Sequence, residues 1–144
     1  DVIERASRLV DQVVVGITRN SGKQHRFSLS ERQAMLQESV ARLANVRVEV
    51  FDGLLVDFVR RLGAQVVIRG IRATSDFDSE FQMATTNRSL DPAIETLFVM
   101  TDTRYSFLSS SLVRELAALG GDISALVPPP VLRHFALGAP WVRQ

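Results

Sequence analysis

The chain has 144 residues, with 17 Lys and Arg against 16 Asp and Glu and a formal net charge of +1. This length fits one packed domain, and 46% hydrophobic with 23% charged residues excludes an intrinsically disordered chain. The absence of cysteine excludes disulfides, thiolate catalysis and cysteine-ligated zinc. The near-neutral charge argues against nucleic-acid binding, and no apolar run approaches the roughly 20 residues of a membrane-spanning helix. We therefore expect a soluble, cytoplasmic protein with one domain over residues 1–144.

Helical and strand-like segments alternate in the first half of the chain. Apolar residues recur at helical spacing from Val2 to Val10, and the apolar run Val13–Ile17 predicts a strand. Ser28 and Glu31 have the spacing of a capping box, which predicts the start of a second helix. The apolar face of that helix comprises Leu36, Val40 and Leu43. The segment Val46–Val50 is the next predicted strand.

The same alternation continues through the second half. The predicted elements are the helix Leu54–Leu62, the strand Val66–Ile68, the helix Asp76–Arg88, the strand Thr96–Met100 and the helices Ser110–Leu119 and Val131–Leu137. Because the strands are rich in β-branched residues without polar alternation, they favour a parallel sheet covered on both faces by helices. The sequence therefore predicts an α/β fold with a doubly wound parallel sheet. Such domains normally open with a strand, whereas this chain opens with a helix, which indicates either an unusual topology or a missing upstream strand.

Cationic and hydroxyl side chains follow three of the four predicted strands. They are Arg19, Lys23 and Arg26 after the first strand, Arg69 and Arg72 around a predicted tight turn after the third, and Arg104 with Ser109, Ser110 and Ser111 after the fourth. Ligands of parallel sheets bind beyond the carboxyl ends of the strands, and a helix N-terminus with hydroxyl groups suits phosphate. This pattern predicts a polyanionic ligand.

Each of these features also has a purely structural interpretation. The serine run fits ordinary helix N-capping, and a loop lysine such as Lys23 fits simple solvation. Asp76, Asp78 and Glu80 either complement the dipole at a helix start or bind Mg²⁺, and the sequence does not discriminate between these roles. No P-loop, GxGxxG turn or GxSxG elbow is present, which argues against those nucleotide sites and against a serine hydrolase.

Three segments resemble one known family in the same order and at the same spacing. Residues 66–90, VVIRGIRATSDFDSEFQMATTNRSL, resemble a block of bacterial phosphopantetheine adenylyltransferase, a member of the nucleotidyltransferase superfamily with a Rossmann-like fold. Residues 104–128, RYSFLSSSLVRELAALGGDISALVP, resemble its nucleotide loop and following helix. Residues 27–39, FSLSERQAMLQES, and the loop with Lys23 resemble its segment around the second helix. The resemblance covers the chain from Asp1 to about Pro130.

The resemblance implies transfer of AMP from ATP to 4′-phosphopantetheine, giving dephospho-coenzyme A and pyrophosphate. It implies that Lys23 and Arg69 hold the phosphate of pantetheine and that the backbone at Leu55 contacts the pantetheine arm. The implied ATP site comprises Gly70, Ile71, Arg72, Glu80, Tyr105, Ser106, Phe107, Leu108, Ser109, Ser110 and Ser111. It further implies Mg²⁺ that arrives with ATP, without a protein metal site, a homohexamer, and coenzyme A as a feedback inhibitor.

The chain departs from the family pattern at its start. The family's opening strand and its catalytic His-x-Gly-His motif are missing, so no catalytic residue is assigned, and we expect the natural protein to extend upstream of Asp1. If the chain truly begins at Asp1, a non-catalytic nucleotide- or coenzyme A-binding remnant is the alternative. A third interpretation is another adenylyl- or cytidylyltransferase of the superfamily, against which Lys23 and the RGIR segment argue. Ser79 stands where the family usually has an aromatic residue.

Overall fold

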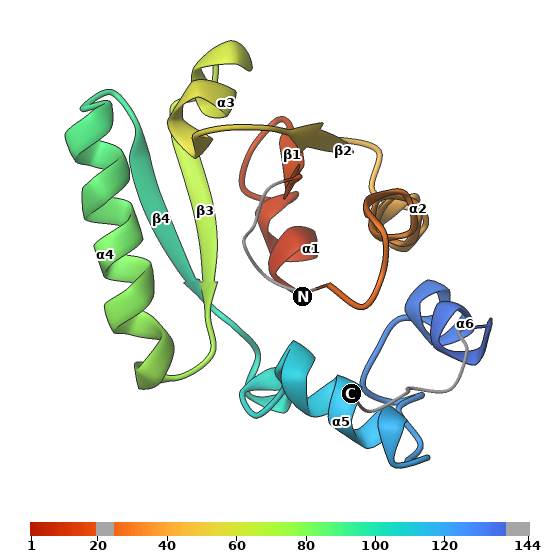
Figure 1. Cartoon of the computed structure of the whole chain (residues 1–144). Coiled ribbons are helices and arrows are strands. Elements are labelled where there is room, and N and C mark those ends of the chain that lie inside the picture. The colour runs from red at the N-terminus through yellow and green to blue at the C-terminus, as the bar shows by residue number, and fades with distance from the viewer. Residues whose placement is uncertain (20–24, 138–144) are drawn as a thin grey trace.

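The computed structural model describes residues 1–19 and 25–137, in which helices and parallel strands alternate (Figure 1). The helices are α1 (Val2–Ala6), α2 (Leu29–Val40), α3 (Leu55–Arg61), α4 (Thr74–Leu90), α5 (Ser110–Ala118) and α6 (Pro129–Leu137), with a 3₁₀ helix η1 at Thr103–Tyr105. The strands are β1 (Val13–Thr18), β2 (Val46–Phe51), β3 (Val66–Ile71) and β4 (Glu95–Met100). Every helix and strand predicted from the sequence is present, and the α/β class is confirmed.

The four strands form two parallel pairs. β1 pairs with β2 from Val13↔Val46 to Thr18↔Phe51, and β3 pairs with β4 from Val66↔Glu95 to Ile71↔Met100. Within the described part of the chain, no strand joins the two pairs. Helix α1 contacts both β1 and β3. The parallel strand direction therefore agrees with the prediction, while α1 provides the link between the pairs.

Two predicted boundaries are corrected by the structure. The tight turn expected at residues 69–72 is wrong, because β3 stays paired with β4 as far as Ile71 and only Arg72 follows the strand. The first helix ends at Ala6 rather than reaching Val10. The Asn45 side-chain amide donates hydrogen bonds to the carbonyl oxygens of Ser7 and Val10, at 2.8 and 3.1 Å, which holds that segment in a turn.

The start of α2 has the predicted capping box. The Ser28 hydroxyl accepts from the backbone N–H of Glu31 at 3.3 Å, and the Glu31 carboxylate accepts from the backbone N–H of Ser28 at 2.8 Å. The Ser28 hydroxyl also donates to the Glu31 carboxylate at 2.7 Å, and this bond, together with the one from the Ser28 backbone N–H, holds the pKa of Glu31 below its ordinary value. The helix ends at Val40, so Leu43 lies beyond it, but Leu43 still packs against the core. The cap thus fixes where α2 begins relative to β1.

The core consists of two apolar clusters that hold helices against the strand pairs. One contains Ile17, Val40 and Val48 between α2 and the first pair, and the other contains Val56, Val59 and Ile94 beside β3. Helix α4 packs against β3 and β4. Three apolar side chains of that pair, Val66, Leu97 and Met100, are nevertheless 43%, 53% and 62% exposed, so the expected cover on both faces is incomplete there. None of the described helices combines the length and apolar character needed to cross a membrane.

Gly16 in β1 lies against the stacked rings of Phe51 and Phe58, whose centroids are 4.4 Å apart. A Cβ atom at this position would lie 2.9 Å from Cε1 of Phe58 and 3.2 Å from Cε1 of Phe51. We predict that Gly16→Ala lowers the free energy of unfolding by about 1–3 kcal/mol, measured by urea denaturation, because the rings must shift. The cost should shrink in a Phe58→Leu background, and an equal cost in both backgrounds would contradict this packing explanation.

Candidate functional site

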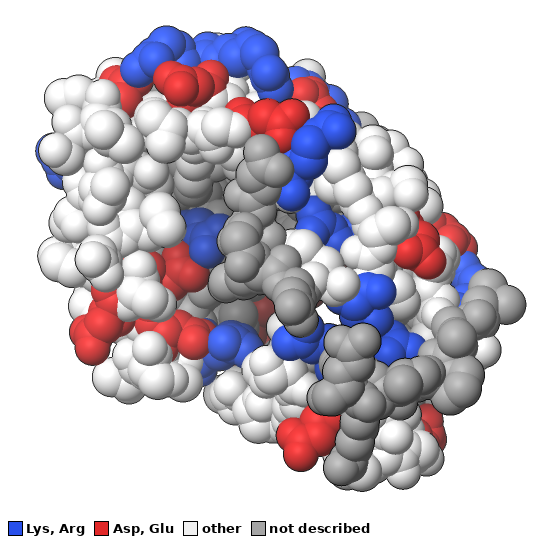
Figure 2. Space-filling view, viewed as in Figure 1, with Lys and Arg blue, Asp and Glu red and all other residues white. Residues whose placement is uncertain are grey.

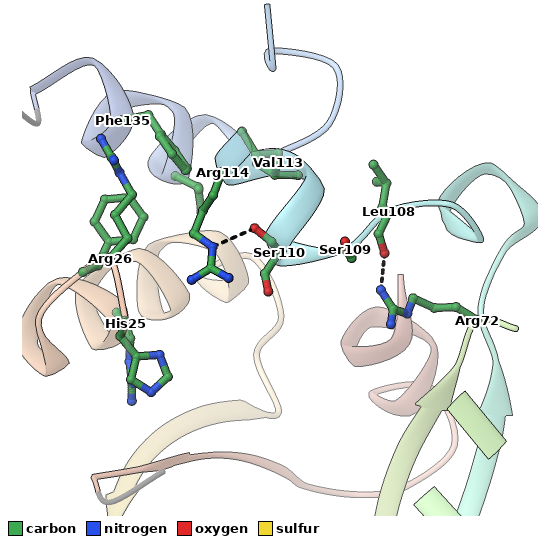
Figure 3. Close-up of a pocket in the computed structure, with 13 residues that line it drawn as sticks. His25, Arg26, Arg72, Leu108, Ser109, Ser110, Val113, Arg114 and Phe135 are labelled. Carbon is green, nitrogen blue, oxygen red and sulfur yellow. Dashed lines mark hydrogen bonds between the residues drawn. The ribbon is translucent and has the colours of Figure 1, made fainter. Parts of the chain in front are cut away.

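A cavity of about 380 Å³ opens between the segment that precedes α2, the N-terminal end of α5, and α6 (Figure 3). Its polar lining comprises His25, Arg26, Arg32, Arg72, Ser109, Ser110 and Arg114, and its apolar lining comprises Phe27, Leu108, Val113, Val127, Val131 and Phe135. Four of these side chains are arginines, and no carboxylate is among the described residues that line the cavity. Figure 2 shows arginine atoms around the hollow in the middle of this face, with some acidic atoms beside them. Such a lining suits an anion of several charges.

Arg72 connects three elements at one side of the cavity. Its Nε and Nη2 each donate to the carboxylate of Asp76 in α4 at 2.9 Å, and its backbone N–H donates to the same carboxylate at 3.1 Å. Its Nη1 donates to the carbonyl oxygen of Leu108, just before α5. The hydrogen bonds from Arg72 lower the pKa of Asp76. Arg72 therefore ties the end of β3 to α4 and to the loop that leads into α5.

The serine run forms the N-terminal end of α5, as predicted. Ser109 is the N-cap, and its hydroxyl accepts from the backbone N–H of Leu112 at 3.1 Å. Arg114 folds back over this first turn, where its Nε donates to the carbonyl of Ser110 at 3.1 Å and its Nη2 to the hydroxyl of Ser111 at 3.3 Å. The capping interpretation is thus confirmed for Ser109. The same helix end presents backbone N–H groups and a positive dipole to the cavity, so capping and anion binding are compatible here.

An aromatic cluster supports the opposite side of the cavity. The rings of Phe27 and Phe135 meet edge to face with centroids 5.1 Å apart, which joins the segment before α2 to α6. The guanidinium carbon of Arg26 lies 4.9 Å from the Phe135 centroid and 5.8 Å from the Phe27 centroid. Cation–π attraction at these distances holds the arginine against the cavity wall.

A second cavity of about 750 Å³ adjoins the first and is bounded by α1, α2 and the loop before α5. Arg32 and Arg72 line both cavities, so their side chains form part of the wall between them. Arg32 is anchored by a hydrogen bond of 2.9 Å from its Nη2 to the carbonyl oxygen of Thr18, at the end of β1. Tyr105 lines only the second cavity.

Arg69 and Glu80, both predicted site residues, pair with each other. Nε and Nη2 of Arg69 in β3 donate to the two carboxylate oxygens of Glu80 in α4, at 2.7 and 2.8 Å. The Glu80 carboxylate raises the pKa of Arg69 through these bonds. Neither side chain is among the lining residues of the two cavities. The pair therefore forms a separate polar contact beside the cavities.

The structure brings together only part of the predicted site. Arg72, Leu108, Ser109 and Ser110 line the first cavity, and Tyr105 lines its neighbour. The predicted residues outside both linings are Leu55, Arg69, Gly70, Ile71, Glu80, Ser106, Phe107 and Ser111. Lys23 lies outside the described residues.

Several of these outlying positions have a packing role. Leu55 begins α3 and packs against the cluster of Val56, Val59 and Ile94, and Ile71 is buried. A Cβ atom on Gly70 would lie 2.8 Å from Cγ2 of Val2 in α1, so glycine permits the close approach of β3 and α1. Phe107 is 61% exposed.

The acidic residues at the start of α4 do not form a metal cluster. Asp76 is held by Arg72 and Glu80 by Arg69, so their carboxylates already have cationic partners. Over residues 1–19 and 25–137, no group of three or more His, Asp or Glu side chains is arranged to hold a metal ion. This geometry opposes the magnesium interpretation of Asp76 and Glu80.

Two lining residues, Arg32 and Arg114, were not singled out from the sequence as site residues. Each lies inside a helix, whereas ligands of parallel sheets are expected beyond the ends of the strands. The sequence does contain a signal that Arg114 belongs to the site. Arg114 follows Ser110 by four residues, so the two side chains lie on the same face of α5. The position of Arg32 depends on the contact between α2 and β1, which spacing along the chain does not reveal.

Comparison with known proteins identifies the family. A family model described as cytidylyltransferase-like matches residues 1–116. The phosphopantetheine adenylyltransferase of Rubrobacter xylanophilus is 54% identical over 132 residues, which cover 92% of this chain and 80% of that protein. The enzymes of the same name from Heliobacterium modesticaldum and Gloeobacter violaceus are 48% and 52% identical, and the matches cover 94% and 97% of this chain and 81% and 89% of those proteins. The chain therefore belongs to the phosphopantetheine adenylyltransferase family.

Proposed function

We propose that this protein transfers the adenylyl group of ATP to 4′-phosphopantetheine, giving dephospho-coenzyme A and pyrophosphate in coenzyme A biosynthesis. The observation that carries the proposal is the cavity with four arginines and no carboxylate in its described lining, at the N-terminal end of α5, in a chain of this family. The named relatives favour this enzyme over a non-catalytic binding remnant. They also favour it over another adenylyl- or cytidylyltransferase of the superfamily.

The chemistry of the reaction matches such a site. A phosphate oxygen of 4′-phosphopantetheine attacks the α-phosphorus of ATP, the bond from that phosphorus to the bridging oxygen breaks, and pyrophosphate leaves with the electron pair. The nucleophile is already an anion, so no covalent enzyme intermediate is needed. Because both substrates are negatively charged, the protein must offset their repulsion and hold them in line. Arg72 and the first turn of α5 supply positive charge where the nucleotide phosphates would lie.

The ATP side of the site is proposed to use Gly70, Ile71, Arg72, Glu80 and the segment from Tyr105 to Ser111. Support comes from the shared cavity of Arg72, Ser109 and Ser110. Glu80 would then act through Arg69, because its carboxylate fixes the plane of that guanidinium group.

The substrate side is proposed to use Lys23, Arg69 and the backbone at Leu55. Glu80 accepts from Nε and from one N–H of Nη2 of Arg69, so Nη1 and the second N–H of Nη2 remain as donors for the phosphate of pantetheine. The role of Lys23 remains a prediction from the resemblance.

Magnesium is proposed to enter as part of the MgATP substrate. Mg²⁺ prefers oxygen ligands and keeps several waters, and nucleotide phosphates supply such oxygens. The carboxylates of Asp76 and Glu80 are engaged by arginines, which supports ligation by the phosphates rather than by a protein cage. We further propose a cytoplasmic location and inhibition by coenzyme A, which carries the same adenylyl and pantetheine groups as the product.

The first test is enzymatic and uses the protein as its gene encodes it. We expect pyrophosphate and dephospho-coenzyme A to form from ATP and 4′-phosphopantetheine. Arg69→Ala should lower kcat/KM for 4′-phosphopantetheine by a factor that corresponds to about 2–4 kcal/mol, because a charged phosphate donor is lost. Arg60→Ala is the matched control, since Arg60 pairs with Asp91 at 2.7 Å outside both cavity linings. An unchanged kcat/KM in Arg69→Ala would refute this role.

A second test concerns the link between Arg72 and Asp76. The pKa of the Asp76 carboxyl group should lie below the ordinary aspartate value of 3.8, and Arg72→Gln should bring it back toward that value, as followed by carbon-13 NMR. Because the folded-state pKa is lowered, the stabilisation is present above pH 3.8 and is lost as the pH falls through the folded-state pKa. Asp76→Asn should therefore flatten the fall of stability in that acidic range. The same Asp76 pKa in wild type and Arg72→Gln would contradict the link.

We also propose that the protein is a homo-oligomer, with a hexamer as the specific expectation. Helix α4 supports this proposal, because it carries three large apolar side chains, Phe77, Phe81 and Met83, that are 44%, 52% and 51% exposed. The rings of Phe77 and Phe81 stack with centroids 5.7 Å apart. The flank formed by α4 is largely uncharged in Figure 2. Apolar exposure of this kind marks protein interfaces.

Light scattering after size-exclusion chromatography tests the assembly. The wild-type protein should elute with six times the mass of its chain, and Phe81→Glu should shift it to smaller species, because a charge would be buried in the contact. Gln37→Glu, which adds the same charge on exposed α2, should leave the mass unchanged. A monomeric wild type, or equal masses for Phe81→Glu and wild type, would contradict the proposal.

A further inference from the structure

Arg32 is a half-buried cation with an incomplete set of partners. It lies near the start of α2 and donates from Nη2 to the carbonyl oxygen of Thr18 at 2.9 Å. Among the residues that the structure describes, no carboxylate forms an ion pair with it, in contrast to Arg69 and Arg72. Its Nε and Nη1 are thus available to an acceptor in the cavity that it lines. A partly desolvated guanidinium group favours a bidentate anion as its partner.

Arg32 shares the cavity with two other arginines from different elements. Arg72 enters from the end of β3, and Arg114 from α5, where it bonds to Ser110 and Ser111. In Figure 3 the guanidinium groups of Arg72 and Arg114 lie on either side of the turn at Ser109 and Ser110. Three guanidinium groups around one helix N-terminus call for a ligand with several negative charges.

We propose that Arg32 and Arg114 bind the β- and γ-phosphates of ATP together with Arg72, and so hold the pyrophosphate leaving group between α2 and the first turn of α5. This inference rests on the proposed adenylyl transfer and adds two residues to it. When the bond between the α-phosphorus and the bridging oxygen breaks, the electron pair remains on pyrophosphate and its negative charge grows. Guanidinium groups already in place at that position stabilise the transition state without further reorganisation.

The hydrogen bond to Thr18 alone does not explain why an arginine, rather than a lysine, occupies position 32. That contact uses a single N–H group, and a lysine at this position could supply one donor to the same carbonyl. Arg32 also lines a cavity to which Arg72 and two serines contribute. Phosphate binding uses the two parallel N–H donors of a guanidinium group. Replacing Arg32 with lysine should therefore affect anion binding more than the hydrogen bond to the Thr18 carbonyl at the end of β1.

The direct test measures binding of inorganic pyrophosphate by calorimetry. Arg32→Gln should weaken pyrophosphate binding about 10- to 100-fold, as expected for loss of a charge-assisted hydrogen bond, and Arg114→Gln should weaken it in the same direction. Arg133→Gln is the control, because Arg133 lies on α6, pairs with Glu38 and lines neither cavity. Equal affinity in wild type and Arg32→Gln would overturn the inference.

Steady-state kinetics separate phosphate binding from a structural effect. Arg32→Gln should raise the KM for ATP, and for pyrophosphate in the reverse reaction, with the KM for 4′-phosphopantetheine unchanged. A purely structural role would raise the constants of both substrates, and that result would overturn the inference. Arg32→Lys keeps the positive charge and one hydrogen-bond donor to Thr18, so pyrophosphate binding is measured with this variant if Arg32→Gln fails to fold. It should show a smaller loss of pyrophosphate affinity than Arg32→Gln.

The outcomes distinguish this inference from the proposed function. If wild type forms dephospho-coenzyme A while Arg32→Gln and Arg114→Gln bind pyrophosphate as tightly as wild type does, the function stands and the inference is wrong. If pyrophosphate binding depends on Arg32 but no pyrophosphate is released from ATP in the presence of 4′-phosphopantetheine, the anion site stands and the proposed function is wrong.

Discussion

The hydrogen bonds of Arg72 are the interaction on which the rest of the site depends. One guanidinium group joins the end of β3 to Asp76 in α4 and to the carbonyl oxygen of Leu108 before α5. β3 and α4 follow each other directly in the chain, whereas Leu108 lies 36 residues beyond Arg72, so the bond to Leu108 joins segments that are far apart in the sequence. Because Asp76 orients the group, Arg72 reaches the cavity wall with a fixed geometry. A cation held in this way needs little reorganisation when an anion binds.

The distribution of charge explains how a nearly neutral chain can serve two anionic substrates. Most arginines of the described chain are paired with carboxylates, as Arg60 is with Asp91 and Arg19 with Asp52. The cavity beside α5 has arginines in its described lining and no acids. Exposed ion pairs contribute little to stability, but they offset the positive charge of arginines that lie away from this cavity. A chain with a formal net charge of +1 can therefore have a local excess of positive charge at this cavity.

Local signals in the sequence predicted most of the fold. The capping box at Ser28 and the apolar runs of the four strands depend on neighbours in the chain, and they gave the order of the elements. The failures came from contacts between distant residues. Pairing with β4 extended β3 through Ile71, and the amide of Asn45 ended the first helix early. Neither contact can be predicted from the spacing of residues within a single segment.

The site was predictable to the same degree and for the same reason. Ser109 and Ser110 are typical of a helix N-terminus, and Arg72 follows a predicted strand. All three residues could therefore be assigned to the candidate site from the local sequence pattern. The pairing of Arg69 with Glu80 could not, because it depends on how α4 packs against β3. Arg32 was missed because its role follows from the rotation of α2 about its own axis. Amphipathic pattern gives that rotation only approximately.

The capping box of α2 has a consequence for that rotation. An α-helix turns by about 100° per residue, so a slip of one residue in the helix register would swing every side chain by that angle. Ser28 and Glu31 prevent such a slip by bonding to each other's backbone, and Arg32 is the very next residue. The capping box that begins α2 thereby also fixes the direction in which the guanidinium group of Arg32 points.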